Sequence, residues 1–256
     1  NLEERGFKIT RYSLDPEYVS NKDKIKDCDI VFLAVPTPTT PKGFDGSLLP
    51  KVLLLVGKGK IAIMKSTVLP GTTEALQKKF KNIILLHSPE FLSEATARQD
   101  TDFPFMNIIG MPKTTPLYKK SAEQVLKILP KAPFSSITKS SESEIIKYAH
   151  NCGGFVQIIF FNLLHDLAKK MKADWSKIEQ AIKADPYIPN RYASPVHKSG
   201  RGAGGHCFIK DFSAFIEIYQ KMLPKDLSAL GALKYFEKKN IELLKASKKD
   251  LDLLKG

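Results

Sequence analysis

Cysteine is scarce in this sequence of 256 residues. Cys28, Cys152 and Cys207 are odd in number and far apart, which excludes the disulfide framework of a small secreted protein and favours a reducing compartment. No charged start followed by an apolar core is found at the beginning of the sequence, as a secretory leader would require. We therefore predict a cytoplasmic protein, and the scattered cysteines leave open that one of them is a working thiol.

Long apolar runs are also missing. The richest run, from Phe155 to Leu164, is interrupted by Gln157 and Asn162 and is too short to cross a bilayer. The sequence therefore predicts no membrane span and no membrane partner. No metal site is predicted either.

Arginine is rare although the net charge is +13, because nearly all of the excess is lysine. The lysines are spread along the chain, and those between Lys234 and Lys255 alternate with acidic residues at spacings typical of a solvated helix face. This distribution argues against a nucleic-acid site and leaves a mild positive field that would favour an anionic substrate.

Short apolar runs alternate with helical patterns in the first half of the chain. Continuous apolar runs indicate strands covered on both faces of a parallel sheet, and we predict them at residues 8–12, 29–35, 60–66, 83–87 and 107–110. Helical spacing lies between them at 48–56, 73–80 and 117–128. The alternation predicts a doubly wound α/β domain over residues 1–138.

One long helical pattern follows, from Glu142 to Met171. Its broad apolar face requires a partner surface, and we predict a homodimer interface there. Gly153 and Gly154 inside it should each cost about 1 kcal/mol relative to alanine, so a close approach is expected at that point. Further helices at 175–183, 212–222 and 227–244 complete an all-helical second domain, 139–226, and a linking or tail helix, 227–256.

Residues 197–211 combine a glycine-rich stretch with Cys207, Lys210 and Asp211. The glycines let the backbone approach a ligand closely, and a helix beginning near Cys207 would favour its thiolate form. The plain alternative is a glycine loop followed by a small buried cysteine, which is about as common.

Five blocks of the sequence, in order, resemble the UDP-glucose/GDP-mannose (nucleotide-sugar) dehydrogenase family. The Gly-Gly-His-Cys-Phe-Ile-Lys-Asp segment at 204–211 resembles its active-site signature. Residues 29–39 resemble the family's cofactor segment at the fourth strand, and residues 65–73 resemble its Ser-Thr-Val-Pro turn. Residues 87–94 resemble its Pro-Glu-Phe-Leu block, and residues 145–151 resemble the start of its dimerisation helix. The resemblance implies a Rossmann-like domain followed by a helical dimerisation domain, with NAD as cofactor and a nucleotide sugar as substrate.

The resemblance also implies a catalytic set. Cys207 would be the nucleophile of a four-electron oxidation that passes through a thiohemiacetal and a thioester. Lys147 and Asn151, which share a helix face, would stabilise the oxyanion. Proton transfer and water activation would fall to Asp211, Glu90 and Thr67. Without the resemblance, Lys147 would be read as a surface lysine and Glu90 as one of two acids at a helix start.

Cofactor and substrate contacts are implied at further positions. Cofactor-binding residues would be Ser13, Val35, Pro36, Thr37, Ser66, Thr67, Glu94 and Lys210. Substrate-binding residues would be Glu90, Phe91, Leu92, Ser93, Glu94, Lys147, Asn151, Arg191, Lys198, Gly202 and Ala203, with Arg191 reaching across the dimer.

Two departures from the family pattern stand out. Residues 1–12 resemble the end of the first helix and the second strand of the family's cofactor domain, while the first strand and its G-x-G-x-x-G turn are absent, so we expect an N-terminally incomplete copy that binds NAD poorly. Ser13 stands where the family has an acidic ribose ligand, which leaves NAD and NADP open, with Asp15 the nearest carboxylate. No block of these 256 residues resembles the family's third domain, so we expect the nucleotide of the substrate to be held differently, for example by the dimer partner.

Two other functions remain open. A two-electron dehydrogenase of the 6-phosphogluconate or hydroxyacyl type would share the two-domain plan but would not need Cys207. A non-catalytic binding or scaffold descendant would explain the missing parts, but it gives no chemical reason for the catalytic residue types to be kept together.

Overall fold

The computed structural model of the protein describes residues 2–40, 43–93, 96–198 and 200–254. The chain divides into two compact units. Unit 1 comprises residues 1–38 and 45–147, and unit 2 comprises residues 39–44 and 148–256. The boundaries predicted after residues 138 and 226 divide the chain by function, whereas these units are divided by compactness. The functional boundaries stay a prediction.

Unit 1 is built on a five-stranded sheet in the order β1-β4-β5-β6-β7. The strands are β1 (Ile30–Leu33), β4 (Ile61–Met64), β5 (Ile84–His87), β6 (Met106–Met111) and β7 (Phe134–Lys139). Neighbours are parallel except for β5 and β6, which are joined antiparallel through the single pair His87 and Gly110. The sheet is thus mostly parallel, as predicted, with one reversed step.

Two differences concern the ends of this sheet. The strand predicted at residues 8–12 is wrong: this described segment is not paired into the sheet, and its Lys8 and Arg11 side chains are exposed. Conversely, β7 was not predicted, because Ser135, Ser136 and Thr138 break up its apolar pattern.

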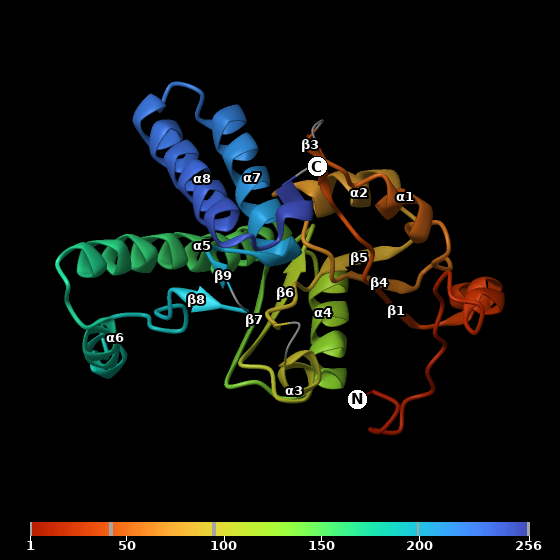
Figure 1. Ribbon diagram of the computed structural model, residues 1–256. Helices are drawn as coiled ribbons and strands as arrows, with labels where there is room; N and C mark the ends of the chain where they lie inside the picture. The colour runs from red at the N-terminus through yellow and green to blue at the C-terminus, as the bar shows by residue number, and fades with distance from the viewer. Residues whose placement is uncertain (1, 41–42, 94–95, 199, 255–256) are drawn as a thin grey trace. The chain divides into compact units, whose positions relative to one another are not determined.

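Helices cover both faces of the sheet, which explains why all four residues of β4 are buried. The helices of unit 1 are α1 (Leu48–Leu53), α2 (Thr72–Lys79), α3 (Ala97–Asp102) and α4 (Pro116–Ile128), with a 3-10 helix at Val19–Asp27. Tyr118, Ala122 and Val125 of α4 pack on Ile63, Leu86 and Ile109 of the strands. Figure 1 shows α4 on one side of the sheet and α1 and α2 on the other. The doubly wound α/β arrangement is confirmed.

The long helix α5 (Ser140–Lys170) begins in unit 1 and continues into unit 2, close to the predicted bounds. A Cβ atom on Gly154 would lie 2.8 Å from the Tyr192 ring and 3.0 Å from the Phe208 ring, whereas one on Gly153 would meet nothing within 4 Å. The predicted close approach is therefore confirmed at Gly154 and wrong at Gly153.

Unit 2 is mainly helical. It contains α6 (Trp175–Ala184), α7 (Gly205–Met222), α8 (Leu227–Ser247) and a 3-10 helix at Leu251–Leu254. Two short hairpins are also present, β2 (Thr39–Thr40) with β3 (Gly43–Phe44), and β8 (Val196–His197) with β9 (Gly200–Arg201). Helices α7 and α8 lie side by side (Figure 1).

Helix α7 begins seven residues before the predicted start at 212, because Gly205, with a φ of +74°, makes the turn into the helix. Cys207 therefore lies on the first turn of α7, outside the helix predicted over residues 212–222.

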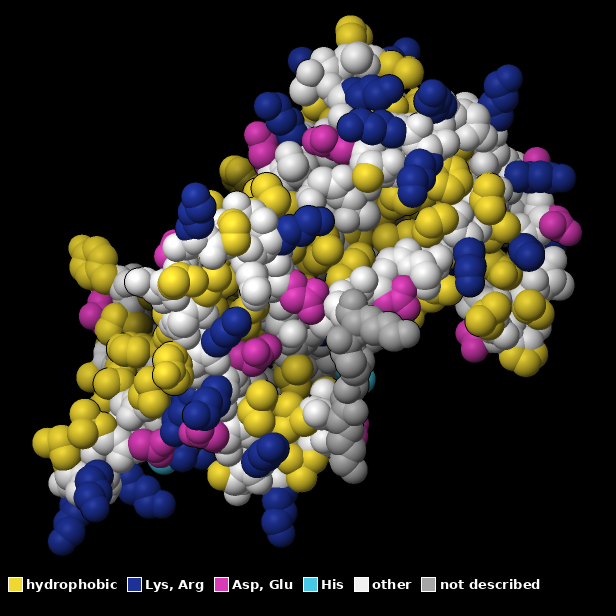
Figure 2. All heavy atoms as spheres, turned by 90° about the horizontal axis from the view of Figure 1, so that it is seen from above, with side chains coloured by type: hydrophobic (Ala, Val, Ile, Leu, Met, Phe, Trp, Pro, Cys, Tyr) yellow, Lys and Arg dark blue, Asp and Glu magenta, His cyan; other side chains and the backbone are white. Residues whose placement is uncertain are grey.

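The surface charges and the apolar content of the helices can both be followed in the structure. On the face seen in Figure 2, lysine and arginine side chains are scattered and interleaved with acidic ones rather than gathered into one patch. In the described part of the chain, no helix is both long and apolar enough to cross a membrane.

Candidate functional site

The carboxyl ends of β1 and β4 bring predicted cofactor residues together. The Ser66 hydroxyl donates to the Val35 carbonyl at 2.7 Å and accepts from the Val35 N–H at 3.0 Å. The Thr37 hydroxyl donates to the Thr67 carbonyl at 2.7 Å. The loop after β1 and the loop after β4 are thus fixed to each other, and Pro36 lies between the two contacts. Open α/β sheets bind their ligands at these strand ends.

Ser13 lies near a carboxylate. Its hydroxyl donates to Asp15 Oδ2 at 2.6 Å, and the Asp15 N–H donates back to the Ser13 Oγ at 3.2 Å. A carboxylate is thus present two residues after the position where the sequence pattern lacked one.

Glu90 contacts two lysines, Lys147 through its backbone carbonyl and Lys65 through its carboxylate. The Lys147 ammonium donates to the Glu90 carbonyl at 2.6 Å and lies 5.6 Å from the centre of the Phe91 ring. Lys65 forms an ion pair with the Glu90 carboxylate at 2.9 Å and donates to the Ser88 hydroxyl at 3.0 Å. Burial lowers the pKa of Lys65, and the Glu90 carboxylate opposes that shift.

Lys65 was not among the predicted site residues. The signal that could have identified it is a lysine directly after a continuous apolar strand, at the start of one of the five matching blocks. A cation at such a position is buried and needs a carboxylate partner.

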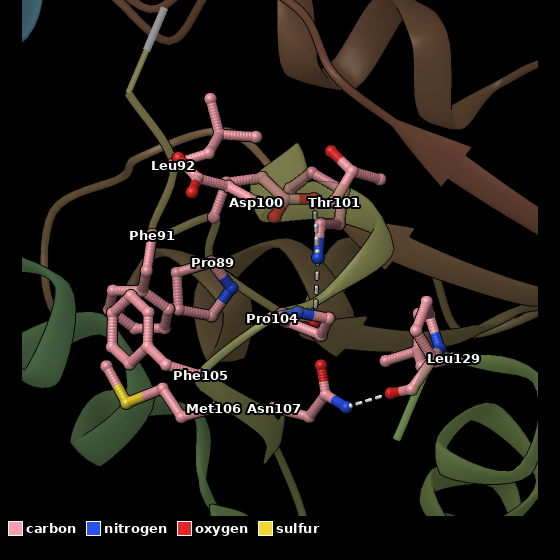
Figure 3. A pocket seen from close by; sticks show the side chains of 14 residues that line it. Pro89, Phe91, Leu92, Asp100, Thr101, Pro104, Phe105, Met106, Asn107 and Leu129 are labelled. Carbon is pink, nitrogen blue, oxygen red and sulfur yellow. Dashed lines mark hydrogen bonds and ion pairs between the residues drawn. The ribbon is translucent and has the colours of Figure 1, made fainter. Parts of the chain in front are cut away.

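A small cavity of about 60 Å³ lies beside this group (Figure 3). The rings of Phe91 and Phe105 meet at its edge with centroids 5.9 Å apart. Its lining includes Lys65, Ser88, Glu90, Leu92 and Asp100. A cavity of this size admits water or one small group, whereas drug-sized ligands occupy several hundred cubic ångströms.

The predicted block after Glu90 is only partly described. The Ser93 N–H donates to Asp100 Oδ2 at 2.9 Å, which fixes this loop to α3. Leu92 lines the cavity. Glu94, predicted for both cofactor and substrate, lies outside the described residues.

Two buried groups anchor the first turns of α5, one to the end of β5 and one to the start of α2. His87 Nδ1 and the Ser143 hydroxyl lie 2.7 Å apart, and burial lowers the pKa of His87 to about 3. The Glu144 carboxylate accepts from the N–H groups of Gly71 at 2.6 Å and Thr73 at 2.9 Å, and from the Thr73 hydroxyl at 2.5 Å. Glu144 therefore caps the start of α2 and fixes the turn of α5 that carries Lys147.

In unit 2, three predicted residues form one polar group. The Asn151 amide donates to Asp211 Oδ2 at 2.5 Å, and the Lys210 ammonium lies 2.6 Å from Asp211 Oδ1. The Asp211 side chain is 1% exposed, so both of its oxygens are engaged in a buried setting. Such a carboxylate is held in one orientation, as proton transfer to or from water requires.

The two thiols of unit 2 differ in character. Cys207 is exposed on the first turn of α7. Cys152 is buried with its Sγ 3.8 Å from the Asp211 carbonyl, and burial raises its pKa to about 12. Since the thiolate is the reactive form, Cys207 is the candidate nucleophile of this unit.

The predicted substrate residues of unit 2 fall into two groups. Arg191 and Lys198 are exposed, and the Arg191 guanidinium lies 5.9 Å from the centre of the Tyr192 ring. Gly202 and Ala203 are buried, so only a local movement would expose them to a substrate. Among the described residues, no three His, Cys, Asp or Glu side chains gather as metal ligands.

Two family models match the chain. The model of the UDP-glucose/GDP-mannose dehydrogenase family, NAD binding domain, matches residues 13–129. The model of the central domain of the same family matches residues 141–232.

Individual relatives agree with these models. The chain is 31% identical over 205 residues to the putative UDP-glucose 6-dehydrogenase YtcA of Bacillus subtilis, covering 75% of this chain and 46% of that protein. It is 31% identical over 232 residues to the UDP-glucose 6-dehydrogenase AglM of Haloferax volcanii, covering 81% and 52%. The solved UDP-glucose dehydrogenase of Pyrobaculum islandicum superposes with a TM-score of 0.72 at 28% identity, covering 86% and 52%. The chain thus spans about half the length of these relatives.

Proposed function

This chain belongs to the UDP-glucose/GDP-mannose dehydrogenase family, and on that premise we propose that the protein oxidises the primary alcohol of a nucleotide sugar, of the UDP-hexose type, to a uronic acid. The observation that carries the proposal is the exposed thiol of Cys207 on the first turn of α7, one turn before the buried Asp211–Asn151 pair. A two-electron oxidation would need no such thiol.

The residue chemistry suits two successive oxidations. The alcohol first becomes an aldehyde, and the Cys207 thiolate adds to its carbonyl carbon to form a thiohemiacetal. A second oxidation converts this adduct to a thioester, and water cleaves the C–S bond, releasing the carboxylate and the thiol. Lys147 and Asn151 would stabilise the oxyanion, and Asp211 would take a proton from the attacking water.

Glu90 and Thr67 are proposed to transfer the proton of the sugar alcohol. The ion pair with Lys65 supports this role for Glu90, because it holds the carboxylate in one orientation. We also propose that backbone and side chains of Phe91, Leu92, Ser93 and Glu94 contact the substrate, with Arg191, Lys198, Gly202 and Ala203.

NAD is the cofactor of the proposal, and when bound it accepts the hydrides. Two parts of unit 1 offer groups that suit a dinucleotide. Asp15 with Ser13 offers a carboxylate for a ribose hydroxyl, and Val35, Pro36 and Thr37 lie after the carboxyl end of β1. Ser66, Thr67, Glu94 and Lys210 complete the proposed cofactor set.

The test is a panel of nucleotide sugars incubated with NAD and either the protein or its Cys207→Ser variant, with Cys28→Ser as the matched control. We expect uronic acid from the protein and from the control, and at least about a thousandfold less from Cys207→Ser. Full turnover by Cys207→Ser would favour the two-electron dehydrogenase. A protein that binds nucleotide sugars without turning over any of them would favour the scaffold.

We also propose that the protein is a homodimer through the Glu142–Met171 helix and works in the cytoplasm. Large apolar side chains on α5 and directly after it support the dimer, since Phe160, Leu163, Leu167 and Met171 are all 45% exposed or more. The free cysteines support a reducing compartment. Sedimentation at micromolar concentration tests the interface: the protein should be a dimer and Leu163→Glu a monomer, while a monomeric wild type would refute it.

A further inference from the structure

The loop that leads into Cys207 is held along its backbone by the end of the chain. Of the five residues 201–205, four have a backbone N–H or carbonyl bonded to a side chain between residues 240 and 250. We name these four side chains the clasp: Asn240, Ser247, Lys249 and Asp250.

Asn240 makes the central contacts of the clasp. Its Oδ1 accepts from the Ala203 N–H at 2.7 Å, and its Nδ2 donates to the Ala203 carbonyl at 2.9 Å. Asn240 is 2% exposed and Ala203 is fully buried. An amide side chain offers a donor and an acceptor at once, so Asn240 pairs with this residue as a neighbouring strand would.

The other three members hold the loop on either side of Ala203. The Ser247 hydroxyl accepts from the Arg201 N–H at 3.0 Å, and the Lys249 ammonium donates to the Gly202 carbonyl at 3.0 Å. Asp250 Oδ2 accepts from the Gly205 N–H at 2.8 Å, at the first residue of α7. The loop is therefore fixed from Arg201 to the turn that carries Cys207.

The glycines of the loop fit the clasp closely. Gly202 has a φ of +89°, and a Cβ atom there would lie 2.9 Å from Asn240 Oδ1. A Cβ atom on Gly204 would overlap the Asp250 carboxylate. Asp250 itself has a φ of +50°, a conformation that costs free energy in a residue other than glycine and persists where surrounding contacts impose it. The glycines of the loop and the backbone of Asp250 thus both fit this contact.

We propose that the clasp residues are positioning residues for Cys207: they set the backbone from which the first turn of α7 starts, and hence the place and ionisation of the thiol. The catalytic meaning of this inference rests on the proposed function. The positioning itself concerns only unit 2 and can be measured without cofactor or substrate.

The experiment measures amide hydrogen exchange of residues 201–205 and the pH dependence of Cys207 alkylation by iodoacetamide, in the whole chain with Cys28 replaced by serine. The variants are Asn240→Ala, Asp250→Ala and Asp250→Asn, and Lys238→Ala on the exposed side of α8 is the matched control. Losing one buried hydrogen bond changes an opening equilibrium by about tenfold, so loop exchange should accelerate about tenfold or more in both alanine variants. The pH at which Cys207 alkylation is half-maximal should also shift in both alanine variants.

Asp250→Asn keeps an acceptor for the Gly205 N–H, so loop exchange should return to within about threefold of the unsubstituted chain, and Lys238→Ala should change nothing. Unchanged exchange and an unchanged alkylation midpoint in both alanine variants would overturn the proposal. Where exchange also accelerates throughout α6, the variant has unfolded, and Ser247→Ala then decides by the same two readouts, because it removes only a hydroxyl.

Turnover separates this inference from the proposed function. In the protein acting on a nucleotide sugar, Asp250→Ala should lower kcat by about tenfold and leave KM within about twofold, because Gly205, whose N–H Asp250 holds, is not among the proposed substrate contacts. If the unsubstituted protein oxidises no nucleotide sugar, the proposed function fails, while the exchange and alkylation results still decide whether the clasp positions the thiol.

Discussion

Unit 1 and unit 2 fix their candidate catalytic groups by different means. In unit 1, buried ionisable side chains do this, since Lys65 pairs with Glu90, Glu144 caps α2 and His87 contacts Ser143. In unit 2, the segment around Cys207 depends on close packing at Gly154 and on the clasp of Asn240 against Ala203. Unit 1 should therefore respond most to changes of charge and pH, and the packing of α5 in unit 2 to changes of volume and shape.

The largest stability effect should come from Glu144→Ala in unit 1. The change leaves the N–H groups of Gly71 and Thr73 and the Thr73 hydroxyl without their buried acceptor, which should lower the free energy of unfolding by about 3 kcal/mol. Glu123→Ala, on the exposed side of α4, should change it by less than about 0.5 kcal/mol. Thermal unfolding followed by circular dichroism compares the two, and equal effects would show that Glu144 is not an anchor.

The pH dependence of unit 1 gives the next effect. The pKa of His87 is lowered to about 3 from an ordinary 6.5, so the unfolded chain binds the extra proton and stability falls as the pH drops through this window. Between pH 7 and pH 5, His87 should account for about 2 kcal/mol of lost stability.

His87→Gln removes the titrating group, so its urea unfolding should lose about 2 kcal/mol less than the wild type between these two pH values. His197→Gln, in an exposed position of unit 2, is the control and should behave like the wild type. Parallel pH profiles for the wild type and His87→Gln would contradict the assigned role of charge in unit 1.

The smallest effect distinguishes two neighbouring glycines of α5. Gly154→Ala should cost about 1–2 kcal/mol, because the added methyl group meets the rings of Tyr192 and Phe208. Gly153→Ala meets nothing and should gain up to about 1 kcal/mol from helix propensity. Urea unfolding of both variants measures the difference, and the same sign for both would contradict the packing described for unit 2.

Much of the fold could be predicted because it depends on local patterns. Continuous apolar runs marked β1, β4, β5 and β6, and regular spacing marked α5 to within two residues at its start. Residues 8–12 show the limit of such patterns: the run is suited to a strand, yet pairing depends on a neighbour that the pattern does not contain. The start of α7 was missed because its first residue is a glycine.

The candidate site was less predictable because its contacts join distant residues. The blocks containing Cys207, Asp211 and Asn151 could be recognised from their residue types, but not the bond between Asn151 and Asp211, which are 60 residues apart. Lys65 and Asn240 were missed for the same reason: each is unremarkable in its own segment, and its partner lies elsewhere, 37 residues away for Asn240 and Ala203.

We propose that Cys207 carries the sugar through a four-electron oxidation. The most direct measurement is the number of NADH molecules formed for each nucleotide sugar consumed, with the sugar limiting and NAD in excess. We expect two NADH per sugar and a uronic acid as product. One NADH per sugar, with an aldehyde or ketone as product, would contradict it.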